Sequence, residues 1–176
     1  MSHVVTEAST YSRPKPDWKQ WIPALIWIGV ICVESTDMMS SEHTGSLLSA
    51  ILMRVLGQVD IFAIMLWNHY LRKLGHVVGY GILSWLLFRA WRATLPSPSG
   101  QLWTFYWAQL AFWMTVVVAG LDEFHQSFIP SRTGRWQDVV LDAAAAAGVQ
   151  MLLFLSLRNK TRPQPTTEPT FARGDR

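Results

Sequence analysis

The stretch LDEFHQSFIPSRTGRWQDVVLDAAAAAG (Leu121–Gly148) decides the fold, because it places many charges beside the most apolar parts of the chain. It contains four acids, one histidine and two arginines. The segment before it, Leu102–Leu121, has no charged residue, and the segment that overlaps its end, Val139–Leu157, has one acid. Charges confined to the ends of long apolar segments are typical of helices that cross a membrane.

The composition also indicates a membrane protein. Half of the 176 residues are hydrophobic, 15% are charged, and the mean hydropathy is +0.17. A soluble domain usually has about 25% charged residues, so we expect one compact domain of the membrane class. The single cysteine, Cys32, cannot form an intrachain disulfide. The net charge is only +3 and the bases do not gather on one face, so we expect no nucleic-acid partner.

Four segments can cross a bilayer, which requires roughly 20 apolar residues. They are Trp21–Val33, Leu74–Phe88, Leu102–Leu121 and Val139–Leu157. The polar residues that precede the first segment do not resemble a cleaved signal peptide. The predicted fold is therefore all-α: a polytopic membrane protein with a bundle of about four transmembrane helices.

The region between the first two spans, residues 44–73, fits no single structure. It is long enough to cross a membrane, but Arg54 and Asp60 would then lie near mid-span. Each ionised group there costs about 2.5–3.5 kcal/mol. We therefore predict one or two interfacial or re-entrant amphipathic helices, with a fifth span as the alternative.

The lysines and arginines predict the orientation of the four spans. With the N-terminus inside, the inner segments hold ten of the fifteen bases and the outer segments hold five. The outer five are Arg54, Arg72, Lys73, Arg132 and Arg135. Cytoplasmic loops usually carry the excess of bases, and a fifth span would remove it. We therefore expect a cytoplasmic polar segment at 1–19, a transmembrane domain at 20–158, and a proline-rich, disordered cytoplasmic tail at 159–176.

This topology gathers titratable side chains at the outer end of the bundle. They lie at the ends of spans one and three and at the starts of spans two and four: Glu34, Asp37, Lys73, His76, Asp122, Glu123, Asp138 and Asp142. Helical spacing places Lys73, His76 and Tyr80 on one stripe, and Asp138 and Asp142 one turn apart. Acids gathered at the mouth of an apolar bundle must be paired with cations, protonated or bound to something.

Two of these segments resemble motifs of the VanZ-like family of bacterial membrane proteins. KLGHVVGY (Lys73–Tyr80) is similar to the family's Lys-x-x-His-x-x-x-Tyr element. DEFHQSFIPSRTGRWQDVVLDAAAAAGV (Asp122–Val149) resembles its longer element of Asp-Glu-x-x-Gln, a Pro-x-Arg turn, an Asp that opens the next helix, and a later Gly. ESTD is similar to the polar close of the family's first span. The resemblance covers about Trp21–Leu157.

The resemblance implies a multi-pass protein of the bacterial cytoplasmic (inner) membrane and a set of candidate pocket residues, but no catalytic role. By matching position these residues are Lys73, His76, Tyr80, Asp122, Glu123, Gln126, Arg132 and Asp138. Asp142 joins them by its spacing, although the family commonly has Asn there. Arg135-Trp136 also departs from the family, where a small hydroxyl residue is common.

Three hypotheses follow. In the first, the outward-facing pocket binds a lipid-linked or phosphate-bearing envelope component, needs no cofactor, and affects susceptibility to glycopeptide antibiotics, because the family's founding member is associated with teicoplanin resistance. In the second, the acids and His76 or His125 hold a divalent metal for chemistry on a lipid phosphate or acyl group. DVVLD resembles half of the Asp-x-x-x-Asp motif of lipid phosphotransferases. In the third, the charges only cap and join helices. The bilayer is a partner in all three.

Overall fold

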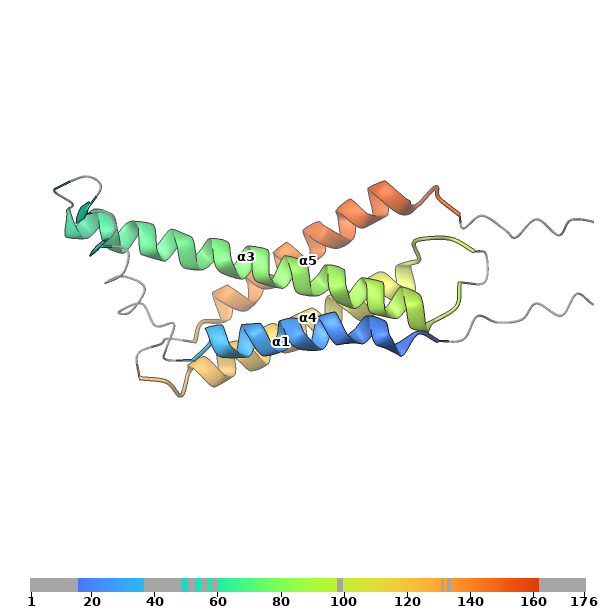
Figure 1. The fold of residues 1–176 in the computed structure, drawn as a ribbon, viewed down its shortest axis with the longest axis horizontal. Helices are drawn as coiled ribbons and strands as arrows, with labels where there is room; N and C mark the ends of the chain where they lie inside the picture. The colour runs from blue at the N-terminus through green and yellow to red at the C-terminus, as the bar shows by residue number, and fades with distance from the viewer. Residues whose placement is uncertain are drawn as a thin grey trace, which may run out of the picture.

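The described residues of this chain form an all-helical fold (Figure 1). The computed structural model describes residues 16–36, 49–50, 53–54, 57, 60–97, 100–130, 132 and 134–161. A short 3-10 helix, η1 (Trp18–Trp21), leads into α1 (Ile22–Glu34). The other helices are α3 (Ile61–Thr94), α4 (Phe105–Gln126) and α5 (Trp136–Leu157). The prediction of an all-α fold is confirmed for this part of the chain.

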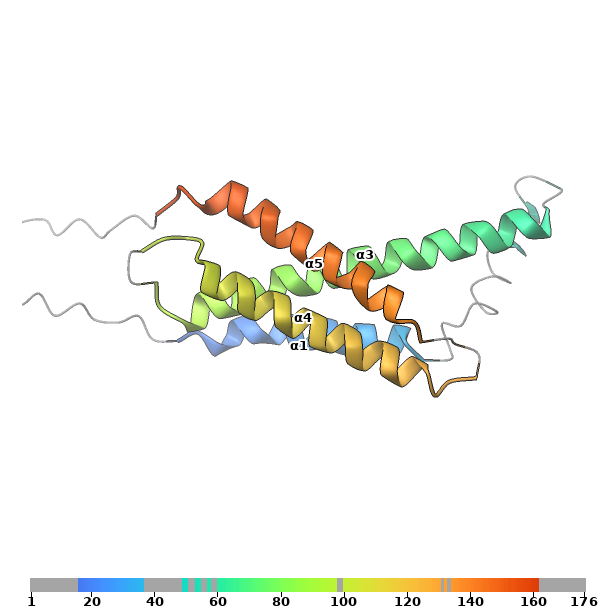
Figure 2. The same ribbon diagram turned by 180° about the vertical axis from the view of Figure 1, so that it is seen from behind.

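Successive helices run in opposite directions. In Figure 1, α1 and α4 point one way while α3 and α5 point the other, and the view from behind in Figure 2 agrees. Helices α3, α4 and α5 all pack against one another, and α1 packs on α3 together with η1. The start of α1 and the end of α5 therefore lie at the same end of the bundle (Figure 1). Which side of a membrane that end faces stays a prediction.

Helices α4 and α5 are each long and apolar enough to cross a membrane. Only 28% of the most apolar part of α4 and 17% of that of α5 is buried inside the protein. The core helix of a soluble protein is mostly buried, so these exposed apolar surfaces are better explained by lipid contact. By length and composition, two of the four predicted spans are thus compatible with a membrane, and the four-span topology stays a prediction.

Helix α3 differs from the expectation for the region between the first two spans. We predicted a separate amphipathic segment before Leu74, but α3 runs without a break from Ile61. Its start is set by Asp60, whose carboxylate accepts a hydrogen bond from Phe62 N at 3.1 Å, and no proline interrupts the helix that follows. The first turns of α3 project beyond the other helices (Figure 1). Most of residues 44–59 lies outside the described residues.

The core of the bundle is built around small side chains on α4. Ala108, Ala111, Thr115 and Ala119 recur at helical spacing and are all buried. Small residues let neighbouring helix backbones approach closely. Two tryptophans attach α1 and η1 to α3: Trp27 Nε1 donates to Gly79 O at 2.9 Å, and Trp21 Nε1 donates to Thr94 Oγ1 at 2.9 Å.

Enlarging a small core residue should separate the helices. In Ala111→Leu, a residue with 0% exposure gains volume that the contact cannot hold, and overpacking typically costs about 1–3 kcal/mol. We expect the unfolding midpoint in a detergent titration to fall accordingly. Ala144→Leu on the exposed surface of α5 is the control and should leave the midpoint unchanged. Equal midpoints for both variants would contradict this packing.

Candidate functional site

Eight of the nine predicted pocket residues meet where α3, α4 and α5 come together. We call this group the polar cluster: Lys73, His76, Tyr80, Asp122, Glu123, Gln126, Asp138 and Asp142. Three polar pairs link helices: Lys73 with Asp138, His76 with Asp142, and Tyr80 with Asp122. Gln126 bonds to Asp122 within α4, and Glu123 lies beside His76 and Asp142. The ninth residue, Arg132, forms hydrogen bonds with the backbone at the end of α1. The helical spacing of these residues in the sequence agrees with their placement side by side, and their role as a pocket stays a prediction.

Two polar pairs join α3 to α5. The Lys73 ammonium forms a salt bridge with Asp138, and His76 Nδ1 lies 3.2 Å from Asp142 Oδ2. The side chain of Asp142 has 0% exposure and that of His76 has 15%. Helices α3 and α5 run in the same direction. Lys73 and His76, three residues apart on α3, therefore face Asp138 and Asp142, which are four residues apart on α5. The spacing in the sequence thus sets the register of the two helices.

A second network joins α3 to α4. Tyr80 donates its hydroxyl hydrogen to Asp122 Oδ2 at 2.9 Å, and Gln126 Nε2 donates to the same oxygen at 3.0 Å. Tyr80 and Gln126 are each 2% exposed. The rings of His76 and Tyr80 stack with centroids 6.0 Å apart. The two networks therefore adjoin along one face of α3.

Glu123 is fixed by the loop that follows α4. Arg135 N donates to Glu123 Oε2 at 2.7 Å, so the loop folds back onto the end of the helix. Gly134 allows this approach, because a Cβ there would lie 2.2 Å from Glu123 O. The carboxylate of Glu123 is thereby held inside the cluster, where the residue is only 5% exposed.

Arg132 binds the backbone at the end of α1. Its guanidinium donates to the carbonyl oxygens of Glu34 at 2.7 Å and Thr36 at 2.9 Å. These carbonyls end α1, which leaves them without partners inside their own helix. The residue is 8% exposed and ties the end of α1 to the loop after α4.

The remaining candidates lie outside the cluster. His125 and the side chain of Arg135 are exposed, and Glu34 is exposed at the end of α1. Asp37 and Glu42 lie outside the described residues. The sequence reasoning missed the backbone N–H of Arg135 as a partner of Glu123, and only the nearby Gly134 could have suggested the close loop.

Two buried carboxylate oxygens in the cluster have no hydrogen-bond partner among the described residues. They are Glu123 Oε1 and Asp142 Oδ1. His76, Glu123 and Asp142 each offer one ligand atom within 4.8 Å of the others. A buried acceptor without a partner costs about 1–3 kcal/mol, and more if it is charged. One imidazole and two carboxylates form a donor set that suits a divalent metal ion.

One family model, described as VanZ/LLP1, matches residues 20–157 of the chain. The matched range contains all four described α-helices and the whole polar cluster. It confirms the family resemblance predicted from the motifs at Lys73–Tyr80 and Asp122–Val149. No curated protein and no solved structure matches the chain.

The tight loop at Gly134 gives a test of the site's geometry. In Gly134→Ala the new Cβ would collide with the Glu123 carbonyl oxygen, and the loop would have to move. We expect a loss of stability of about 1–3 kcal/mol, measured by unfolding in detergent. Gly148→Ala is the matched control, because a Cβ there meets nothing within 4 Å; alanine in a helix should be neutral or stabilising by about 1 kcal/mol. Equal stability of the two variants would contradict the loop geometry.

Proposed function

We propose that this protein, which belongs to the VanZ/LLP1 family because that family model covers residues 20–157, binds the phosphate of a lipid-linked envelope component through a divalent metal ion in its polar cluster. The observation that carries the proposal is the pair of buried carboxylate oxygens of Glu123 and Asp142 beside His76, which have no hydrogen-bond partner in the described part of the chain. A bound cation would satisfy both oxygens.

The cluster is poorly suited to binding a phosphate without help. Lys73 is already paired with Asp138, and Arg132 donates to the backbone at the end of α1. A phosphate that entered the cluster would meet the carboxylates of Asp122, Glu123 and Asp142, which repel an anion. A divalent cation reverses the sign of the local charge. Metal binding and phosphate binding therefore support each other at this site.

The donor set narrows the choice of metal. His76, Glu123 and Asp142 would supply one nitrogen and two oxygen ligands. Imidazole suits Zn²⁺ and other transition metals, and carboxylates suit Mg²⁺, Ca²⁺ and Mn²⁺. Mn²⁺ and Zn²⁺ accept both ligand types, so we expect one of them to bind most tightly. The metal would supply the positive charge that phosphate oxygens need. Tyr80, Asp122 and Gln126, which are hydrogen-bonded to one another, would lie beside it.

The family resemblance connects this binding to the cell surface. Glycopeptide antibiotics act on cell-wall precursors at the outer membrane surface, and such precursors are linked to lipid through phosphate. With the predicted orientation, the polar cluster lies at the outer end of the bundle. A protein that holds such a component would change how these antibiotics reach their target.

A hydrolytic function on the same lipid phosphate is the second candidate. It is favoured by the hydrogen bond between His76 and Asp142, because a carboxylate that orients an imidazole is a common arrangement for acid–base catalysis. Water would attack phosphorus, the bond from phosphorus to the lipid alcohol oxygen would break, and that oxygen would take a proton. Release of inorganic phosphate or of a free alcohol from a polyprenyl phosphate separates catalysis from binding alone.

Metal binding should be visible in thermal stability. We expect Mn²⁺ or Zn²⁺ to raise the melting temperature of the purified full-length protein by several degrees, because a ligand at about 100 times its Kd stabilises by about 2.7 kcal/mol. Asp142→Asn should abolish the increase. Asp138→Asn is the matched control: it lies one helical turn earlier, pairs with Lys73 and is outside the metal group, so it should retain the increase.

The metal site would be contradicted if Mn²⁺, Zn²⁺ and Mg²⁺ all left the melting temperature unchanged and elemental analysis found no metal. An equal loss of the increase in both variants would favour a purely structural role for the acids.

Phosphate recognition should depend on the same metal. In nanodiscs, we expect polyprenyl phosphate to be retained at least tenfold better than the matching polyprenol, a difference of about 1.4 kcal/mol. Chelation with EDTA or the substitution His76→Ala should remove this preference. If the two lipids were retained equally with the metal present, phosphate recognition would be wrong even if the metal binds.

In cells, any change in teicoplanin susceptibility should disappear in Asp142→Asn at unchanged protein abundance.

A further inference from the structure

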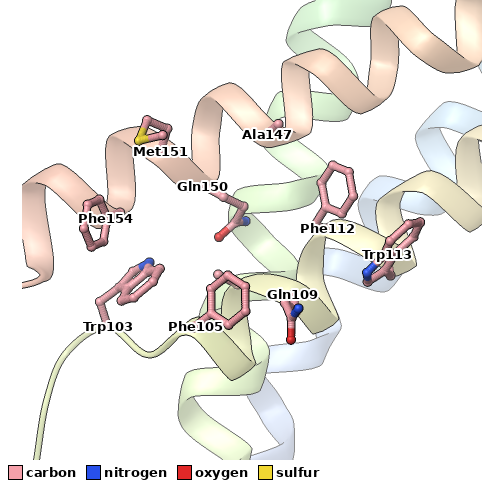
Figure 3. Close-up of a pocket in the computed structure, with 10 residues that line it drawn as sticks. Trp103, Phe105, Gln109, Phe112, Trp113, Ala147, Gln150, Met151 and Phe154 are labelled. Atoms are coloured by element: carbon pink, nitrogen blue, oxygen red, sulfur yellow. The ribbon is translucent and has the colours of Figure 1, made fainter.

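A pocket lies between α4 and α5 (Figure 3), near the start of α4 and the end of α5, whereas the polar cluster lies near the end of α4 and the start of α5. We call it the aromatic groove, after the residues that line most of it: Trp103, Phe105, Phe112, Trp113, Met151 and Phe154. Its volume is about 530 Å³, within the range of about 300–1,000 Å³ found for small-molecule sites. It is distinct in residues and in chemistry from the site of the proposed function.

The lining of the aromatic groove suits a hydrocarbon chain. Aromatic rings and a flexible methionine offer a large apolar surface. Small residues widen the groove, since Ala108 on α4 and Ala147 on α5 carry only methyl groups. Gln150 forms part of the wall. Its amide nitrogen donates to Ser84 on α3, with 2.8 Å to Oγ and 3.2 Å to the carbonyl oxygen, and its amide oxygen is buried without a hydrogen-bond partner among the described residues. An apolar chain can therefore enter without displacing a hydrogen bond.

One hydrogen-bond donor faces this apolar surface. The indole Nε1 of Trp103 is buried and has no partner among the described residues. Figure 3 shows its ring beside Phe154 at one end of the groove, and the two ring centroids lie 4.8 Å apart. A buried N–H without an acceptor is costly. The ester carbonyl of a lipid is an acceptor that would reach this position with its acyl chain in the groove.

Two basic residues follow the end of α5 at the same end of the groove. The guanidinium of Arg158 stands 5.1 Å from the centroid of the Phe154 ring. Lys160 is held next to the start of the groove, because its carbonyl oxygen accepts a hydrogen bond from Leu102 N at 3.0 Å. No acid occurs in residues 95–121 or 143–161. The mouth of the aromatic groove is therefore positively charged and attracts an anionic group.

The spacing of these groups suits a glycerophospholipid. The Arg158 guanidinium lies 5.1 Å from the centroid of the Phe154 ring, and the centroid of the Trp103 ring lies 4.8 Å from the same ring. The donor and the cation are therefore both neighbours of Phe154. In a glycerophospholipid, the ester carbonyls are separated from the phosphate by the glycerol backbone. We propose that the aromatic groove binds one acyl chain of an anionic glycerophospholipid, with its phosphate at Arg158 and Lys160 and its ester carbonyl at Trp103.

Titration of the delipidated full-length protein with lipid, followed by native mass spectrometry, tests the groove. We expect phosphatidylglycerol to bind about tenfold more tightly than phosphatidylcholine with the same acyl chains, as about 1 kcal/mol per base near an anionic head group suggests. Ala147→Phe fills the groove and should abolish this binding. Ala144→Phe is the control, because Ala144 is exposed on the same helix but does not line the groove.

Two further variants separate the parts of the site. Trp103→Phe keeps the ring and removes the N–H, so it should weaken both lipids about fivefold, as expected for one hydrogen bond. The pair Arg158→Gln and Lys160→Gln should remove only the preference for phosphatidylglycerol.

Unchanged lipid binding in Ala147→Phe would overturn the proposal, and so would equal binding of the two lipids by the unsubstituted protein. A third result would also overturn it: dimers in the unsubstituted protein that Ala147→Phe dissociates, because a second copy of the chain would then occupy the groove.

Discussion

The complete burial of Asp142 is the constraint on which the arrangement of the helices depends. A carboxylate with 0% exposure must be compensated, and its hydrogen bond with His76 links α5 to α3. The same contact continues along both helices, from the pair of Lys73 and Asp138 to the bonds between Ser84 and Gln150. A slip of one residue between α3 and α5 would leave all of these polar groups unpaired. Polar pairing, rather than apolar packing alone, therefore fixes the register.

Much of the site could be predicted from the sequence because its partners occur at helical spacing. The intervals between Lys73, His76 and Tyr80 and between Asp138 and Asp142 gave both faces of the contact. The partners of Arg132 could not be predicted in this way, since it binds backbone carbonyl oxygens that every residue has. The continuity of α3 was also missed: the cost of Asp60 inside a span argued for a break, whereas Asp60 lies just before the helix and caps it.

The two ends of the bundle carry opposite chemistry. Among the described residues, the polar cluster holds carboxylate oxygens without a hydrogen-bond partner, and the aromatic groove has a donor without an acceptor and two basic residues near its mouth. One end is therefore suited to a cation and the other to an anion. Arg158 and Lys160 are two of the ten bases that the predicted orientation places on the cytoplasmic side. A lipid at each end would be recognised by different physical forces, so the two sites can be separated by substitution.

The run of small residues on α5 explains why both sites exist together. Ala146 is fully buried against α3, where Ser84 donates to its carbonyl oxygen at 3.4 Å. A larger side chain there would move α5 away from α3 and break the hydrogen bond between Asp142 and His76. Ala147, the next residue, is equally small but points toward α4, where its methyl group leaves the aromatic groove open. Close approach on one face of α5 and open space on the adjacent face therefore both follow from a single stretch of alanines.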